Sequence, residues 1–118
     1  MTPTLLTRKQ KVIVEKYFVA FPNRSDKEYL NNEYDIKMFN IIDKVIKLYE
    51  RNREKSIFIE KYLIGREVWQ DAHFKLFIER RTYFQWKDEI LTDAVIYAIK
   101  DNLIELDADI DDEKSAAL

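Results

Sequence analysis

The sequence of residues 75–87 is Lys-Leu-Phe-Ile-Glu-Arg-Arg-Thr-Tyr-Phe-Gln-Trp-Lys, and no other stretch of the chain is as informative. A short apolar break at residues 76–78 is followed at once by a segment that opens with basic and polar side chains. The second helix of a helix-turn-helix begins in this way, because its first turn must offer long donors to DNA while its opposite face is buried. The pattern therefore predicts a helix-turn-helix over about residues 53–91, and the alternative is an ordinary amphipathic helix.

Within the predicted second helix, Tyr83, Trp86 and Ile90 have the spacing i, i+3, i+7 and are expected to face the core. The remaining positions carry donors suited to DNA, since arginine pairs with guanine, glutamine with adenine, and lysine or threonine with phosphates. Residues 75–87 hold four cations and one acid, and the binding of DNA phosphates requires such an excess of positive charge. Phe84 is expected either to touch a thymine methyl group or to pack on a neighbouring helix. The predicted DNA-binding residues are Lys75, Arg80, Arg81, Thr82, Phe84, Gln85 and Lys87.

The composition favours one nearly all-helical domain. Hydrophobic residues make up 47% of the 118 residues and charged residues 36%, with one glycine and two prolines. A chain of this length has room for a single modest core, and few helix breakers accompany its many Lys, Glu, Ile and Leu residues. The spacing of apolar residues predicts an all-α fold of about five helices within residues 1–106, at residues 8–21, 36–50, 53–64, 67–77 and 80–106.

Three residues are expected to shape the ends of these helices. Thr7 is a suitable N-cap for the first helix. Gly65 is the only glycine, so we expect it to end its helix in the left-handed conformation. Glu79 precedes the basic helix, where its charge suits the helix dipole but its side chain is a poor cap.

Charge is distributed unevenly along the chain. Residues 1–100 carry 19 Lys and Arg against 15 Asp and Glu, whereas residues 101–118 carry one Lys against seven acids. A mildly basic body thus precedes an acidic tail at residues 107–118, which we expect to be disordered because it is too charged to bury. The tail is expected to serve as a solubilising end, to compete with DNA for the basic surface, or to touch RNA polymerase.

Residues 81–87, Arg-Thr-Tyr-Phe-Gln-Trp-Lys, resemble the opening of the last helix in the ArpU/RinA group of regulators, which are encoded by phages of Gram-positive bacteria. Tyr62-Leu63 is similar to the aromatic-leucine pair that precedes the motif in that group, and residues 53–91 as a whole resemble the helix-turn-helix of sigma-factor region four. The resemblance implies a transcriptional regulator of phage late or packaging operons that acts on promoter or operator DNA in the bacterial cytoplasm. It departs from the group at Glu79, where a better cap is usual.

The sequence contains no signature of an enzyme. There is no glycine-rich phosphate loop, no HExxH motif and no nucleophile with a plausible base, so we expect neither catalysis nor a cofactor. The absence of cysteine excludes a disulfide scaffold and a cysteine zinc site, and it is compatible with a reducing compartment. His73 is the only histidine and lacks the partners that a metal site needs. No apolar run approaches membrane-spanning length.

Two other classes of function remain open at this point. One is a small helical interaction module, such as an inhibitor or adaptor of a host protein, whose aromatic residues would supply the interface. The other is a DNA-packaging component similar to a small terminase subunit. For the regulator, a homodimer is expected if the DNA site is palindromic, because one small module buries little surface alone.

Overall fold

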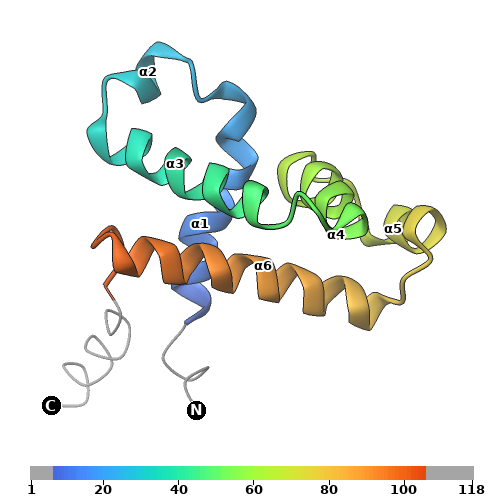
Figure 1. Cartoon of the computed structure of the whole chain (residues 1–118). Helices are drawn as coiled ribbons and strands as arrows, with labels where there is room; N and C mark the ends of the chain where they lie inside the picture. The colour runs from blue at the N-terminus through green and yellow to red at the C-terminus, as the bar shows by residue number, and fades with distance from the viewer. Residues whose placement is uncertain (1–6, 106–118) are drawn as a thin grey trace, which may run out of the picture.

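The computed structural model describes residues 7–105, and within them the chain is all-helical, as the sequence predicts (Figure 1). Residues 7–105 form six α-helices where about five were expected, because the polar segment at residues 27–30 forms one short extra helix, α2. Two other helical segments, the 3-10 helix η2 and the π-helix η3, continue α1 and α4. The elements are α1 (Arg8–Ala20), η2 (Phe21–Asn23), α2 (Lys27–Leu30), α3 (Glu33–Leu48), α4 (Arg53–Phe58), η3 (Ile59–Ile64), α5 (Trp69–Leu76) and α6 (Arg80–Lys100).

The long helix α6 organises the fold. It runs beneath α3 and α4, α1 crosses behind it, and α5 lies near its N-terminal end (Figure 1). One hydrophobic core joins all of these helices and extends to Ile104. The largest fully buried side chains are Phe18, Phe58, Met38, Ile41, Ile42, Ile59, Leu63 and Ile90.

The start of α1 is fixed by a reciprocal cap and tied to the end of the described chain. The Thr7 hydroxyl accepts a hydrogen bond from the Gln10 amide at 3.2 Å, and the Gln10 side-chain oxygen accepts one from the Thr7 amide at 2.7 Å. The predicted N-cap is thus confirmed. Gln10 is also buried, and its side-chain amide donates to the Glu105 carbonyl at 2.7 Å.

The helix α3 follows the predicted apolar spacing. Phe39, Ile42 and Val45 are buried, as expected for core positions, and Asn32 caps the helix by accepting a hydrogen bond from the Asp35 amide at 3.2 Å. Ile36 has the same three- and four-residue spacing from these residues but is 39% exposed, because it lies in the first turn of the helix.

The predicted role of Gly65 is wrong. Its φ is −81°, and the left-handed residue is its neighbour Arg66 with φ 59°. The glycine is needed for space: the Gly65 amide bonds the Glu60 carbonyl at 3.0 Å, and a Cβ added to Gly65 would lie 2.7 Å from the Lys61 carbonyl oxygen. The wide π-helical turn therefore explains why a residue without a side chain stands here.

The last helix is shorter than predicted. It ends at Lys100 rather than near residue 106, and Asn102 then adopts a left-handed φ of 60°. The Leu103 amide bonds the Ala98 carbonyl at 2.8 Å, which closes the helix end and turns the chain back so that Ile104 enters the core. The predicted acidic tail at residues 107–118 lies outside the described residues. Among residues 7–105, no helix is long and apolar enough to cross a membrane.

Candidate nucleic-acid interface

The predicted break between the last two helices is a three-residue turn, residues 77–79. Phe77 ends α5 in the left-handed conformation, with φ 56° and ψ 38°, and Ile78 is buried at 8% exposure. The His73 ring nitrogen Nδ1 donates a 2.9 Å hydrogen bond to the Ile78 carbonyl. The single histidine thus has a structural role, which is to hold this turn.

Aromatic side chains hold the first half of α6 against α4 and η3. Tyr83 is 6% exposed, and its ring centroid lies 5.1 Å from that of Phe58 and 5.8 Å from that of Tyr62. Trp86 is half-buried, with its ring 5.7 Å from Phe58. Ile90, one turn further on, is fully buried. The predicted inward-facing stripe is therefore confirmed, and it fixes which face of α6 remains for solvent.

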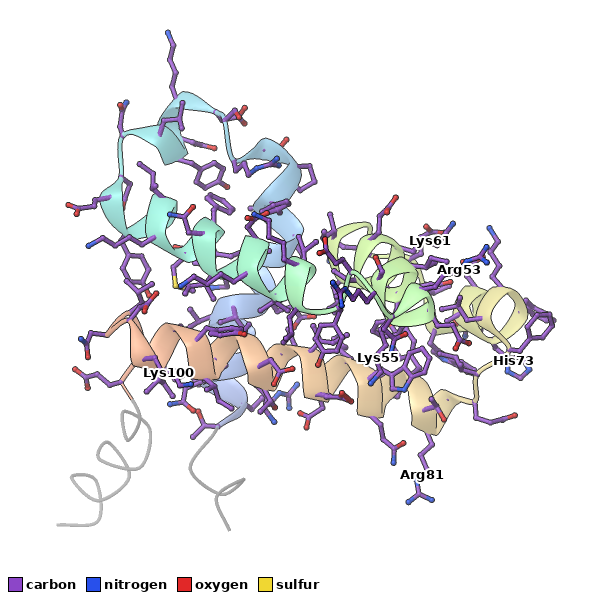
Figure 2. The ribbon with its side chains drawn as sticks, viewed as in Figure 1. Arg53, Lys55, Lys61, His73, Arg81 and Lys100 are labelled. Carbon is purple, nitrogen blue, oxygen red and sulfur yellow. The ribbon has the colours of Figure 1, made fainter. Side chains whose placement is uncertain are left out.

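Arg81 and Gln85 lie on that solvent face. Both are exposed, and they are one helical turn apart. Figure 2 shows Arg81 extending from the first turn of α6, away from α4 and α5. Among residues 7–105, neither side chain has an ion pair or a hydrogen bond. Thr82, beside them, is half-buried and so lies on the flank of this face.

Arg80 is held between two aromatic rings. Its guanidinium carbon lies 5.7 Å from the centre of the Trp69 ring and 5.6 Å from that of Phe84. Phe84 itself is 45% exposed, and its ring packs edge-on against Tyr83. The two cation–π contacts limit the directions that Arg80 can take but leave its guanidinium accessible, because the residue as a whole is exposed.

The two predicted lysines do not join Arg81 and Gln85. Lys87 is on the other flank of α6, where its ammonium lies 2.9 Å from the Glu15 carboxylate on α1. Lys75 is exposed on α5 and pairs with Asp71 at 3.6 Å. A phosphate contact by Lys87 would require the Glu15 pair to open.

Acidic residues bound the basic face. Glu79 is the N-cap residue of α6 but makes no side-chain capping bond, as the sequence predicts. Asp88 follows Gln85 by three positions on the same side of the helix and pairs with Lys11 of α1 at 2.5 Å. On α6, the surface suited to an anionic ligand is thus confined to the first two turns.

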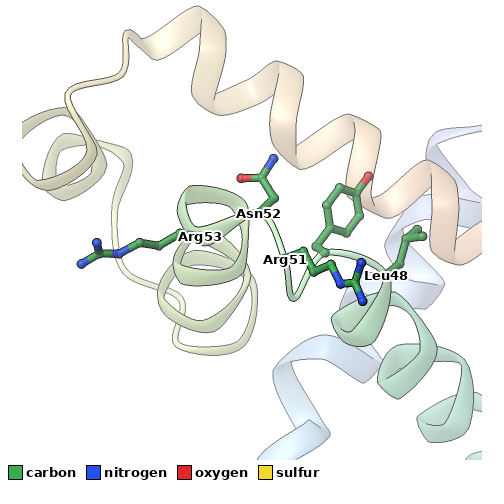
Figure 3. A pocket seen from close by; sticks show the side chains of 5 residues that line it. Leu48, Arg51, Asn52 and Arg53 are labelled. Carbon is green, nitrogen blue, oxygen red and sulfur yellow. The ribbon is translucent and has the colours of Figure 1, made fainter.

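A second pair of arginines borders a shallow hollow between α3 and α4. Arg51 and Arg53 are both exposed, and neither has an ion pair within the part of the chain that the structure describes. Figure 3 shows that their side chains diverge, with Arg53 directed away from α3. The two guanidinium groups therefore do not converge on one small anion. The hollow is lined by Leu48, Tyr49, Arg51, Asn52 and Arg53.

A hydrogen bond between Tyr62 and Asp71 ties η3 to α5. The Tyr62 hydroxyl donates to the Asp71 carboxylate at 2.7 Å. Burial, and then this bond, raise the pKa of Tyr62 above its ordinary value, while the same bond lowers the pKa of the Asp71 carboxyl. The bond thus fixes the two helices that precede α6, and the amphipathic pattern alone does not reveal it.

Sequence reasoning missed the most exposed apolar residues of this region. Phe77 is 88% exposed, Phe74 is 76% exposed and Val68 is 64% exposed. The apolar letters of residues 76–78 suggested only a break between helices. Apolar spacing does not show that Leu76 and Ile78 point inward while Phe77, between them, points to solvent.

Residues 7–105 contain no group of three or more His, Asp or Glu side chains that could hold a metal ion. The accessible chemistry of the site is therefore that of hydrogen-bond donors and cations on an anchored helix, next to exposed aromatic rings. No family model, no curated protein and no solved structure matches this chain.

Proposed function

We propose that the chain is a double-stranded DNA-binding protein that places the first two turns of α6 in the major groove. The observation that carries the proposal is the state of Arg81 and Gln85, which are exposed and free of partners among the described residues. They stand on a helix whose opposite face is buried and which follows a three-residue turn. These are the features that a recognition helix needs.

The chemistry of the two side chains suits base edges. An arginine guanidinium can donate two parallel hydrogen bonds to guanine, and a glutamine amide can both donate to and accept from adenine. Arg80 and Lys75, which flank the turn, would contact the phosphate backbone. Such contacts make binding dependent on salt, since each neutralised phosphate releases a counterion.

We further propose that the DNA is a promoter or operator site and that the protein is a transcription regulator of phage or prophage origin. The support is the order of residues 81–87 and its resemblance to the ArpU/RinA group. The protein would then act in the cytoplasm of the bacterial host, as a homodimer on a palindromic site, with RNA polymerase as a possible further partner.

Fluorescence anisotropy with labelled duplexes, at low salt and then across a salt series, tests DNA binding. Arg81→Ala combined with Gln85→Ala should weaken binding to the preferred duplex at least tenfold, since each base contact contributes about 1–3 kcal/mol. The thermal midpoint should stay unchanged because both side chains are exposed. Lys27→Ala, which removes an exposed cation from the distant helix α2, is the control and should bind normally. No binding by the unaltered chain to any duplex at low salt would overturn the proposal.

A protein-interaction module is the second candidate, and the exposure of Phe74 and Phe77 favours it. Exposed aromatic rings are typical of protein interfaces and contribute little to binding duplex DNA. Co-purification of a stoichiometric protein together with an absence of DNA binding would select this candidate. For the packaging component, ring-shaped oligomers in solution would be expected instead.

A further inference from the structure

The region of α5, the turn and the start of α6 carries an exposed or half-buried aromatic surface, made of Val68, Trp69, His73, Phe74, Phe77, Arg80 and Phe84. Ring contacts connect its parts: His73 lies 6.4 Å from Trp69 and 5.5 Å from Phe74, and the Arg80 guanidinium bridges Trp69 and Phe84. Phe77 stands at the turn itself. Five of these residues are therefore linked through their side chains, and Val68 and Phe77 adjoin them along the chain.

Phe77 is unfavourable for the isolated protein in two ways. An aromatic ring that is 88% exposed gains almost nothing from the hydrophobic effect, and a bulky residue with φ 56° is strained where glycine would not be. The structure around the turn shows no compensating contact for the ring among the described residues. A strained, exposed aromatic residue indicates a surface that gains its stabilisation on binding.

The charges around the aromatic surface indicate the kind of partner. Near it, Lys75 on α5 and Arg80 and Arg81 at the start of α6 supply three cations against two acids, Asp71, which pairs with Lys75, and the exposed Glu79, so one positive charge is in excess. A partner must therefore combine apolar side chains with carboxylates. Residues 106–113 of this same chain have that composition, Leu-Asp-Ala-Asp-Ile-Asp-Asp-Glu.

The geometry excludes delivery of Leu106 and Ile110, the apolar residues of this segment, from the same molecule. The described chain ends beyond the C-terminal end of α6, whereas the aromatic surface lies at its N-terminal end (Figure 1). The 21 residues of α6 span about 30 Å at 1.5 Å per residue. From Glu105 to Ile110, even a fully extended chain covers only about 18 Å. Ile110 and the aspartates beside it therefore cannot reach Phe77 of their own chain.

We propose that the aromatic surface binds the acidic segment 106–113 of a second copy of the chain. Leu106 and Ile110 contact the rings of Phe74 and Phe77, and the aspartates pair with Arg80, Arg81 and Lys75. The proposal does not rest on DNA binding. The proposal does imply that DNA and the acidic segment cannot bind at the same time, because both would use Arg80 and Arg81.

Zero-length carbodiimide cross-linking of an equimolar mixture of ¹⁵N-labelled and unlabelled full-length chains tests the proposal. Lys75 should be joined to a carboxylate in residues 107–113, and half of these products should contain one labelled and one unlabelled peptide. The Lys75–Asp71 pair, 3.6 Å apart within one chain, serves as the internal control and should give only products of uniform label. Only uniformly labelled products between Lys75 and the acidic segment, or no such product at all, would overturn the proposal.

Sedimentation equilibrium of full-length variants provides the second readout. Phe74→Ser with Phe77→Gly, and separately Asp109→Asn with Asp111→Asn and Asp112→Asn, should each weaken self-association at least tenfold. Control variants lose a comparable exposed group elsewhere: Leu30→Ser for the aromatic pair, and Asp26→Asn with Glu28→Gln and Glu50→Gln for the acids. Self-association that survives both test variants, or a protein that is monomeric at every concentration, would show the inference to be wrong.

Discussion

The Tyr62 hydroxyl and the Asp71 carboxylate, 2.7 Å apart, form one of three tyrosine–aspartate bonds within residues 7–105 that each join two helical segments. Tyr17 of α1 donates to Asp35 of α3 at 2.6 Å, and Tyr49, which ends α3, donates to Asp93 of α6. In each tyrosine the pKa is raised, first by burial and then by the bond to the aspartate. These bonds add directional contacts to a core whose packing is mostly apolar and less directional.

Tyr62→Phe should lower the thermal midpoint at pH 7 by a few degrees, because the Asp71 carboxylate loses its phenolic donor. The pKa of Asp71 is lowered in the folded state, so the stabilisation is present above the carboxyl's unfolded pKa and is lost as the pH falls through its folded pKa. The difference between variant and parent should therefore shrink in acid. Tyr97→Phe, which removes a hydroxyl without a described hydrogen bond, is the control. Equal effects of the two changes at pH 7 would contradict this account.

Alkaline pH should destabilise the fold. The pKa values of Tyr17, Tyr49 and Tyr62 are raised in the folded chain, so above about pH 10 the unfolded chain releases phenolic protons that the folded chain keeps. The contribution of these tyrosines to the free energy of unfolding is fully present below that pH and falls as the pH rises. Phenolate absorbance near 295 nm should increase in step with the loss of helical circular dichroism. Titration of all tyrosines well before unfolding would contradict the prediction.

The adjacent residues Gly65 and Arg66 should respond in opposite ways to substitution. Gly65→Ala places a Cβ 2.7 Å from the Lys61 carbonyl oxygen, and we expect a loss of at least about 1 kcal/mol in the free energy of unfolding. Arg66→Gly relieves a left-handed φ of 59°, and we expect a gain of about 0.5–1 kcal/mol. Urea denaturation measures both. Gly65→Ala would also be destabilising if Gly65 were the left-handed cap, so Arg66→Gly separates the two accounts. An absence of any gain in Arg66→Gly would contradict the prediction.

Asp88→Asn should strengthen the proposed binding of DNA. The carboxylate lies on the same side of α6 as Gln85, and its removal both lowers repulsion of phosphates and frees the ammonium of Lys11. We expect a several-fold increase in affinity at low salt and a steeper dependence on salt, because one more cation is available. Anisotropy titrations at several salt concentrations measure both quantities. Asp43→Asn, which opens an ion pair with Lys47 on α3, should leave binding unchanged.

Apolar spacing was enough to predict the helical class and the inward stripe of α6, and the hydroxyl of Thr7 was enough to predict the cap. These features follow from local rules: a periodicity of 3.6 residues and a hydroxyl at a helix start. The spacing could not predict the π-helical turn at Ile59–Ile64, because apolar periodicity does not distinguish one wider turn from the α-helical turns around it. The wrong prediction of a left-handed Gly65 has the same origin, because Gly65 stands at the end of this π-helical turn.

The candidate site could be predicted in part for a similar reason. Exposure of Arg81 and Gln85 follows from burial of Tyr83 and Ile90, which the spacing defines. The pairing of Lys87 with Glu15 depends instead on how α1 crosses α6, and no local pattern encodes that crossing. Phe77 is exposed where its own backbone is left-handed, and an apolar side chain does not predict that conformation.

The placement of the two tryptophans has a practical consequence for spectroscopy. Trp69 contacts His73 and Arg80, and Trp86 contacts Phe58, so both indoles report on the half of the molecule formed by α4, η3, α5 and α6. Tryptophan emission would then record directly only the surroundings of these two side chains, whereas far-ultraviolet dichroism records every helix. Comparing the two signals in a single denaturation would show whether both halves of this molecule unfold together or in separate steps.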